Sequence, residues 1–307
     1  MATLTTCFAP SAVPPEATGP HGIAMDGKAQ RGRLRCAGSG GPVHALIAVC
    51  HDQRIVLAHE PIAAAPAMEK GAAELTVAPR LIDRIDWHER VLTGDALFCQ
   101  RTLCQQGRAA GGDYLVLVKE NQGALDRDIQ LLFDPPPALA RRPLRDRRVA
   151  QTVEPGHGRS RERRALIAST DLTAYLAWPG LAQVFRIERT WREHGQPRQA
   201  RHYGITSLPP ADADPARLLA LKRGHWTIEH RVHRGKAVNF GEDASLIHVG
   251  QGPTVMALLR DAAVRLLHRG AAGGHPPPGT QPAPRRRLGR WTPEYSRISP
   301  GRQRTTC

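Results

Sequence analysis

The chain has 307 residues, and 43 lysines and arginines against 28 aspartates and glutamates give it a formal net charge of +15. This length allows one large domain or two modest ones. The basic excess favours a polyanionic partner, above all nucleic acid, although an Arg-enriching, GC-rich genome would produce part of the same composition. The first 21 residues lack the pattern of a signal peptide, and no apolar run reaches the length of a membrane helix. We therefore expect a cytoplasmic protein without a membrane partner.

The first elements predicted along the chain are strands. Residues 1–21 indicate an irregular lead-in, and Ile23 and Met25 then alternate with small residues in a short strand that ends at Asp26. Asp26-Gly27 is also a common hairpin-turn pair. Two β-branched runs, 42–51 and 54–61, predict a hairpin that continues an antiparallel sheet.

Helices and strands alternate in the next part of the chain. The predicted elements are a helix over 76–86, a strand over 90–97, a helix over 98–110, a strand over 113–118 and a helix over 124–133. Thr76 and Asn121 are the candidate caps of the first and last of these helices. This order predicts an α/β fold, a mixed sheet flanked by helices. Asp26 and Asp95 fall where strands end, and ligands gather at the carboxyl ends of strands in such sheets.

The second half is more basic. Residues 138–210 indicate a β-rich, Arg-rich insertion with strands at 183–191 and 200–208. Helices follow at 215–226, where Asp212 and Asp214 are candidate caps, and at 252–269. The tail 270–307 is rich in Gly, Pro and Arg and is predicted to be disordered.

Between those two helices lies a basic stretch with one acid, Glu229, on a predicted helix. Trp226 and Ile228 are expected to pack inward behind it, and Glu242 and Asp243 follow in a turn. Asp26, Asp95 and Glu229 together match what phosphodiester chemistry needs, because convergent carboxylates can hold two divalent ions ~3.5–4 Å apart. Glu242 is the competing third acid.

Each of the three acids also has a structural interpretation. Asp26 could be a turn residue, Asp95 a helix cap and Glu229 one half of a surface ion pair. Sequence alone does not show that the three side chains converge.

Eight motifs, in order over about 22–269, resemble bacterial insertion-sequence transposases of the DDE superfamily, in the group of the H-repeat-associated proteins. They are AMDGKAQRG (24–32), LTGDALFCQ (92–100), GGDYLVLVKENQ (111–122), GHGR (156–159), WPGLAQVFRIER (178–189), YGITSL (203–208), RGHWTIE (223–229) and FGEDAS (240–245).

The resemblance implies an RNase H-like catalytic domain over 22–269, with the insertion before the last catalytic helix. It also implies that Asp26, Asp95 and Glu229 bind two Mg²⁺ or Mn²⁺ ions for DNA strand cleavage and strand transfer. The partners would be double-stranded DNA, at element ends and at the target, and a second copy of the chain on that DNA. The candidate DNA-binding residues are Lys28, Arg31, Arg159, Arg161, Arg231 and Lys236, for which a solvated or acid-paired charge is the competing interpretation.

The chain departs from the family around the third acid. His230, Arg234 and Ala237 replace other residues, and Gly235 costs a helix about 1 kcal/mol. Only 25 residues precede Asp26, fewer than in family members. These departures predict a truncated and degenerate copy of a transposase, with a frame shift as one explanation. The alternatives are a catalytically inactive DNA-binding relic and a general metal-dependent nuclease.

Overall fold

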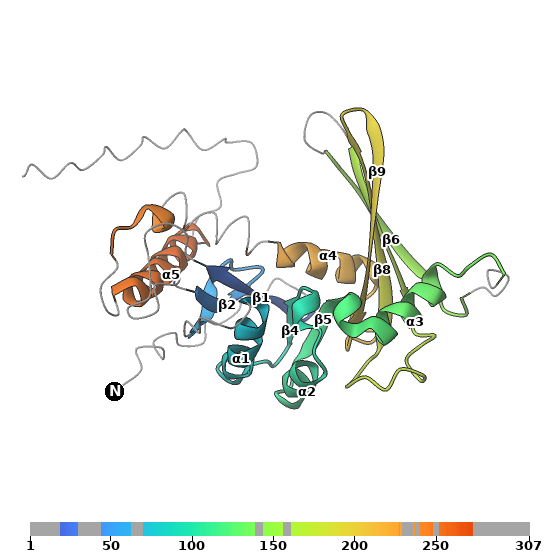
Figure 1. The fold of residues 1–307 in the computed structure, drawn as a ribbon, viewed down its shortest axis with the longest axis horizontal. Coiled ribbons are helices and arrows are strands. Elements are labelled where there is room, and N and C mark those ends of the chain that lie inside the picture. The colour runs from blue at the N-terminus through green and yellow to red at the C-terminus, as the bar shows by residue number, and fades with distance from the viewer. Residues whose placement is uncertain are drawn as a thin grey trace, which may run out of the picture.

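A nine-stranded mixed sheet forms the centre of the molecule, with the strand order β3-β2-β1-β4-β5-β9-β8-β7-β6 (Figure 1). The computed structural model describes residues 19–29, 44–62, 70–138, 144–155, 161–226, 228, 236, 240–247 and 252–272. The strands are β1 (His21–Ala29), β2 (His44–Cys50), β3 (Val56–Ile62), β4 (Arg90–Gly94), β5 (Asp113–Val118), β6 (Arg148–Pro155), β7 (Arg161–Ser169), β8 (Gln183–Glu193) and β9 (Gln196–Thr206). The α-helices in the described ranges are α1 (Lys70–Asp83), α2 (Arg101–Ala109), α3 (Gly123–Phe133), α4 (Pro215–His225) and α5 (Gly252–Ala272).

Three neighbouring strands, β1, β4 and β5, run parallel and end at one edge of the sheet. The other pairs are antiparallel, so the predicted mixed α/β sheet is confirmed. The last residues of β9, Tyr203–Thr206, pair with Val118–Leu115 of β5. Through this pairing the Arg-rich strands β6–β9 continue the same sheet, and they extend from it as a long ribbon (Figure 1).

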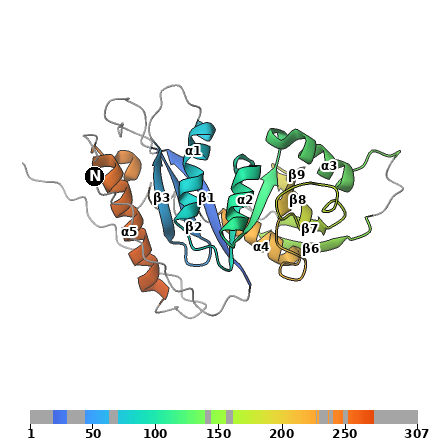
Figure 2. The ribbon, with the colours of Figure 1, turned by 90° about the horizontal axis from the view of Figure 1, so that it is seen from below.

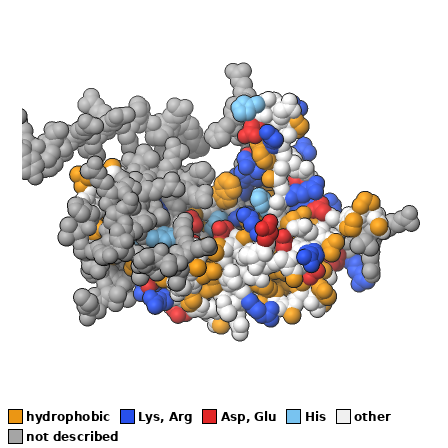
Figure 3. Space-filling model, viewed as in Figure 1, with side chains coloured by type: hydrophobic (Ala, Val, Ile, Leu, Met, Phe, Trp, Pro, Cys, Tyr) orange, Lys and Arg blue, Asp and Glu red, His pale blue; other side chains and the backbone are white. Residues whose placement is uncertain are grey.

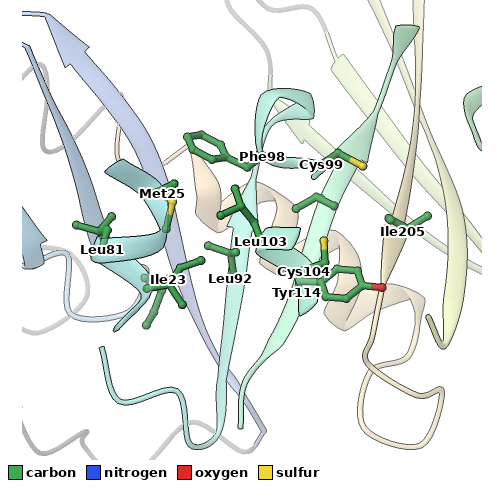
Figure 4. Close-up of a cluster of buried hydrophobic side chains, with 14 of the residues drawn as sticks. Ile23, Met25, Leu81, Leu92, Phe98, Cys99, Leu103, Cys104, Tyr114 and Ile205 are labelled. Carbon is green, nitrogen blue, oxygen red and sulfur yellow. The ribbon is translucent and has the colours of Figure 1, made fainter. Parts of the chain in front are cut away.

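The two faces of the sheet are covered by different helices. On one face, Ile23, Met25 and Leu92 pack with buried residues of α1, α2 and α3 (Figure 4). On the opposite face, Val91 and strands of the ribbon pack against Leu218, Leu219 and Leu221 of α4. α5 lies beside β3 at the far edge (Figure 2). Among the described helices, none has the length and apolar character that crossing a bilayer requires.

Three local predictions were wrong. β1 continues through Asp26 to Ala29 because β2 pairs with it along this whole length, so Asp26 lies within a strand and not in a turn. Helix α1 begins by Lys70, and Thr76 lies inside it, where its hydroxyl donates to the Ala73 carbonyl at 2.7 Å. Asn121 does not cap α3: its amide donates to the carbonyl of Ala96 at 2.6 Å.

Of the other predictions, some agree with the structure, one does not, and some fall on residues outside the described ranges. Asp214 caps α4 by accepting the Arg217 amide at 2.8 Å, as expected for one of the two candidate aspartates. Ile228 is fully buried, but Trp226 is 43% exposed and lies under the Arg164 guanidinium, 5.8 Å from its ring centre. Most of the lead-in 1–21, most of the tail 270–307 and the segment around Glu229 lie outside the described residues.

A buried polar contact joins α4 to the sheet. The Thr93 hydroxyl on β4 lies 2.9 Å from Nε2 of His51 and 3.3 Å from Nδ1 of His225, the last residue of α4. It also donates to the carbonyl of Ile23 on β1 at 3.2 Å. We call His51, Thr93 and His225 the histidine latch, because they join the residue after β2, the second-last residue of β4 and the last residue of α4.

Two glycines allow the latch to close. A Cβ atom at Gly22 or at Gly224 would lie 2.2 Å from Nδ1 of His51. The His51 ring therefore lies between the backbones of β1 and α4. Any side chain at Gly22 or Gly224 would overlap the ring. This contact sets the distance of α4 from the strand that carries Asp26.

We predict that acid destabilises the fold through the latch. Burial lowers the pKa of His51 to about 4 and, with the nearby charge of Lys222, lowers the pKa of His225 well below its ordinary value. Between pH 6.5 and about 4 the unfolded chain therefore binds more protons than the folded chain. The free energy of unfolding should fall with decreasing pH in this window, by up to about 1.4 kcal/mol per pH unit for each histidine.

Urea unfolding at pH 7.5, 5.5 and 4.5 measures this slope. His51→Asn and His225→Asn should each flatten it, whatever they do to stability at pH 7.5. His88→Gln, which removes an exposed histidine, should leave it unchanged. An equal slope in all four proteins would mean that the latch does not determine the acid response.

Candidate active site

Asp26 and Asp95 lie level with each other on neighbouring parallel strands. The register of β1 and β4 pairs Ile23 with Leu92 and Ala24 with Thr93. Continued for two more residues along both chains, the same register places Asp26 opposite Asp95. Both acids therefore lie beyond the last paired residues, where the two strands begin to separate.

Strand alternation directs both side chains to the face that α4 covers. Ala24, two residues before Asp26, packs with Ile228, which follows α4. Thr93, two residues before Asp95, contacts His225 of α4 through the latch. Asp26 and Asp95 thus belong to the same side of the sheet as the end of α4.

Asp95 also begins the short 3₁₀ helix η2 (Ala96–Phe98). Its Oδ1 accepts the amide of Leu97 at 2.9 Å, so the predicted cap is present. The carboxylate reaches solvent, yet the surrounding protein partly desolvates it, and this raises the pKa of Asp95. The charges of Asp26 and Glu74 raise it further, while the Leu97 bond and Lys222 oppose them. Such crowding of acids favours binding of a cation.

The third predicted acid, Glu229, lies outside the described residues. In the part of the chain that the structure describes, no three His, Cys, Asp or Glu side chains come close enough to hold a metal ion. The two described acids supply hard oxygen donors of the kind that Mg²⁺ and Mn²⁺ prefer. A site for two such ions would need a further acid besides these two.

Glu242, the competing third acid, is fully buried in a set of ion pairs that we call the buried ion network. Its carboxylate lies 2.9 Å from Nζ of Lys28 on β1 and 3.7 Å from Nζ of Lys236. Lys236 also lies 2.6 Å from Asp261 of α5. The Glu242 carboxylate is thus neutralised by two lysines, an arrangement that disfavours a metal ligand.

The same network bears on two predicted DNA contacts. The Lys28 side chain is 11% exposed and the Lys236 side chain is 2% exposed, and both are directed at buried carboxylates. Burial alone would raise the pKa of Asp261, but the charge of Lys236 and the hydrogen bond from His59 lower it. For Lys28 and Lys236 the acid-paired interpretation is the one that the geometry favours.

The structure does not describe the side chains of the other four predicted DNA-binding residues. Arg31, Arg159, Arg231 and the side chain of Arg161 lie outside the described part of the chain. In β7 and β8, however, Arg163 and Arg192 are exposed and share one face with Thr190, which pairs with Arg163 across the strands. They line an open groove of about 670 Å³ near the end of the ribbon. Figure 3 shows basic side chains gathered along this ribbon.

A second groove, of about 690 Å³, opens beside Asp95. The residues that line it follow β4, end or follow β5, or belong to α3 and β9. Burial lowers the pKa of His202, and the positive charges of Lys119 and Lys222 lower it further. The groove has a mixed charge, with acids at Asp95, Glu120 and Asp126 and bases at Lys119 and Arg201.

Sequence reasoning missed one acid close to this site. Glu74 on α1 is 4% exposed and accepts a hydrogen bond from His44 at 3.0 Å. It packs directly over β1, because a Cβ atom at Gly27 would lie 2.0 Å from its Oε1. The helix was predicted to begin at residue 76, so Glu74 was not considered. The run of good helix formers before Thr76, Ala72 and Ala73 among them, was the available signal.

Comparison with known proteins adds to this geometry. The family model described as "Transposase DDE domain" matches residues 19–266. "Putative transposase YncI" of Escherichia coli O157:H7 is 27% identical over 249 residues, which cover 80% of this chain and 61% of that protein. "H repeat-associated putative transposase YhhI" of Escherichia coli K12 is 25% identical over 255 residues, 80% of this chain and 63% of that protein. The chain thus spans about three fifths of the length of these relatives.

A solved structure described as "piggyBac transposase synaptic complex with hairpin DNA" is 10% identical, with a TM-score of 0.40, over 84% of this chain and 49% of that one. Since the family model matches most of its length, the chain belongs to the family of proteins with a transposase DDE domain.

Proposed function

We propose that the protein is a DNA transposase that cleaves a phosphodiester bond at the ends of a mobile element and joins the freed 3′-OH to target DNA. Asp26, Asp95 and Glu229 would hold the metal ions, and the domain would be RNase H-like. Family membership supports the reaction class. The order β3-β2-β1-β4-β5, with only β2 antiparallel to its neighbours, is what an RNase H-like core would have.

The observation that carries this proposal is the position of Asp26 and Asp95. By strand register they lie opposite each other on neighbouring strands, and they share the face of the sheet that α4 covers. Phosphodiester cleavage needs carboxylates that converge without being neutralised by nearby bases. In contrast to Glu242, Asp95 is exposed and crowded by other acids. Ile228, one residue before Glu229, is packed on Ala24, two residues before Asp26. This contact brings the chain to the acidic edge of the sheet just before the third acid.

Two Mg²⁺ or Mn²⁺ ions, when bound, would activate the attacking oxygen and stabilise the leaving 3′-oxygen. The chain's own residues would orient the reactants. Asp26 and Asp95 hold their carboxylates on one face, and the histidine latch keeps α4 against that face. Water would attack first and break the P–O3′ bond, which releases a 3′-OH at the element end. This 3′-OH would then attack a phosphate of the target strand, whose own P–O3′ bond would break and release a target 3′-OH. Both steps use the same arrangement of acids.

DNA would lie along the basic surfaces on the β5 side of the acids, from the groove beside Asp95 to the ribbon. In the described ranges, Arg163 and Arg192 have no carboxylate partner, and Lys119 is exposed at the groove beside Asp95. Exposed basic side chains such as these can bind phosphates, whereas Lys28 and Lys236 are buried against carboxylates. The ribbon continues the sheet that carries the acids, so a duplex bound to it would be held in a fixed relation to the site.

We predict that Asp95→Asn and Asp26→Asn each reduce Mg²⁺-dependent nicking of supercoiled DNA at least about 100-fold, because the ligand's negative charge is lost and metal stabilisation amounts to several kcal/mol. Asp212→Asn, at an exposed aspartate before α4, should nick like the unaltered protein. Nicking is measured on plasmids with and without the element's terminal repeats, and repeat-dependent cleavage supports transposition.

Undiminished nicking by Asp95→Asn would contradict the assignment of the acids. Salt-sensitive DNA binding with no cleavage under any divalent ion would instead identify a catalytically inactive DNA-binding protein.

We also predict that the double variant Arg163→Gln/Arg192→Gln binds duplex DNA more weakly, to a similar degree for all sequences. Loss of two phosphate contacts should reduce the slope of log K against log salt by about two. Arg80→Gln, which removes an arginine whose side chain is 71% exposed on α1, is the matched control and should change neither quantity. Fluorescence anisotropy at several salt concentrations measures both, and equal affinity for all three proteins would remove the ribbon from the DNA surface.

A further inference from the structure

We propose that three side-chain amides, those of Gln100, Asn121 and Gln122, fix the turn that follows Asp95 and thereby hold the Asp95 carboxylate in its metal-binding orientation. We call these three side chains the amide cage. They are positioning residues, since they act through the turn and not on the metal or the DNA. The inference rests on the proposed function for the role of Asp95, but the cage itself can be tested separately.

The cage consists of three hydrogen bonds to three carbonyls of one short turn. Asn121 donates to the carbonyl of Ala96 at 2.6 Å, and Gln122 donates to that of Cys99 at 3.0 Å. Gln100 donates to the carbonyl of Leu97 at 3.1 Å. The turn between Asp95 and α2 is therefore held from both sides, by the start of α2 and by the residues that follow β5.

This turn needs outside donors. The helix η2 has only three residues, and 3₁₀ hydrogen bonds have poorer geometry than those of an α-helix. A turn of this length leaves most of its carbonyls without helical partners. Its backbone bonds run from the Cys99 amide to the Ala96 carbonyl, at 3.2 Å, and from the Gln100 amide to the Phe98 carbonyl, at 2.8 Å. The side-chain amides supply donors to the Leu97 and Cys99 carbonyls and a second donor to the Ala96 carbonyl, and so select one conformation of the turn.

Neither Asn121 nor Gln122 caps the helix that it precedes. The sequence predicts Asn121 as the N-cap of α3, a role in which Asn typically contributes about 1 kcal/mol. The cap position of α3 is Gln122, and it makes no side-chain cap hydrogen bond. The side chains are directed across to the neighbouring strand end instead. Because local capping would be the simpler use of these residues, the contact with the 96–99 turn is the feature that needs explaining.

The consequence for Asp95 follows from its cap bond. Its Oδ1 accepts the amide of Leu97, a residue inside the caged turn. If the turn is rigid, this bond fixes the side-chain torsions of Asp95 and leaves Oδ2 as the oxygen for a metal ion. If the turn is loose, Leu97 moves and the carboxylate rotates. The cage also joins the ends of β4 and β5, since η3 (Glu120–Gln122) follows β5 directly.

Isosteric variants without a donor test the inference. Asn121→Leu and Gln122→Met each remove one bond to the turn, and Gln106→Met is the matched control. Gln106 is also an amide that bridges two elements, from α2 to the Pro79 carbonyl and the Asp83 carboxylate, but it does not touch the turn. Thermal unfolding of each variant checks that the fold is retained.

The first measurement is hydrogen exchange of the Leu97 amide in the metal-free protein. We expect exchange at least about tenfold faster in Asn121→Leu and Gln122→Met, and unchanged in Gln106→Met. The second is Mn²⁺ binding followed by electron paramagnetic resonance. Loss of a residue that orients a ligand typically weakens metal binding 10–100-fold, and we expect about tenfold for each cage variant.

Leu97 exchange and Mn²⁺ affinity equal to those of Gln106→Met would overturn the inference. Faster exchange with unchanged Mn²⁺ affinity would also overturn it, because the amides would then fix the turn without affecting the metal-binding orientation of Asp95. Absence of Mn²⁺ binding in the unaltered protein would contradict the proposed function instead, and slow Leu97 exchange that depends on the amides would still support the cage.

Discussion

The parallel pairing of β1 with β4 is the constraint on which the rest of the site depends. It brings two acids from distant parts of the sequence to the same level, because the register is fixed wherever one face of a strand is buried. Ile23, Met25 and Leu92 provide that fixed face. A slip of one residue would turn Asp26 towards α1 and α2 and expose part of the core. The position of the acids is thus a by-product of hydrophobic packing on the opposite side of the same strands.

Buried polar contacts then position the elements that packing alone leaves free. α4 is joined to the sheet by the buried contacts of His51 and His225 with Thr93. Lys236 and Glu242 are held by the buried ion network. Buried ion pairs add little net stability over apolar packing, but breaking one leaves an uncompensated charge at a cost of about 3–5 kcal/mol. The latch joins α4 to the sheet before Glu229, and the ion pairs join Lys236 to α5 and Glu242 to β1 after it.

The sequence predicts the strands and helices well, because the alternation in β1, the continuous apolar run in β5 and the helical spacing in α5 are local patterns. It also selects Asp95, whose cap role follows from the strand-to-helix junction. It fails where partners are distant in sequence. The pairing of Lys28 with Glu242 and the bond from Asn121 to Ala96 join separate motifs, and for Asn121 the local cap was an equally good physical choice. Trp226 was assigned to the core by its apolar character, whereas Arg164 gives it a partner near the surface.

The basic insertion after β5 continues the sheet that carries Asp26 and Asp95, because its last strand returns to β5. β9 ends by pairing with β5, and α4 begins nine residues later, after Thr206, on the face that the acids share. The strands that add basic surface therefore also deliver α4 to the latch. Catalytic acids and DNA-facing arginines would then belong to one continuous hydrogen-bonded sheet. A ribbon joined only by a flexible linker would give the same charge without fixing where a bound duplex meets Asp95.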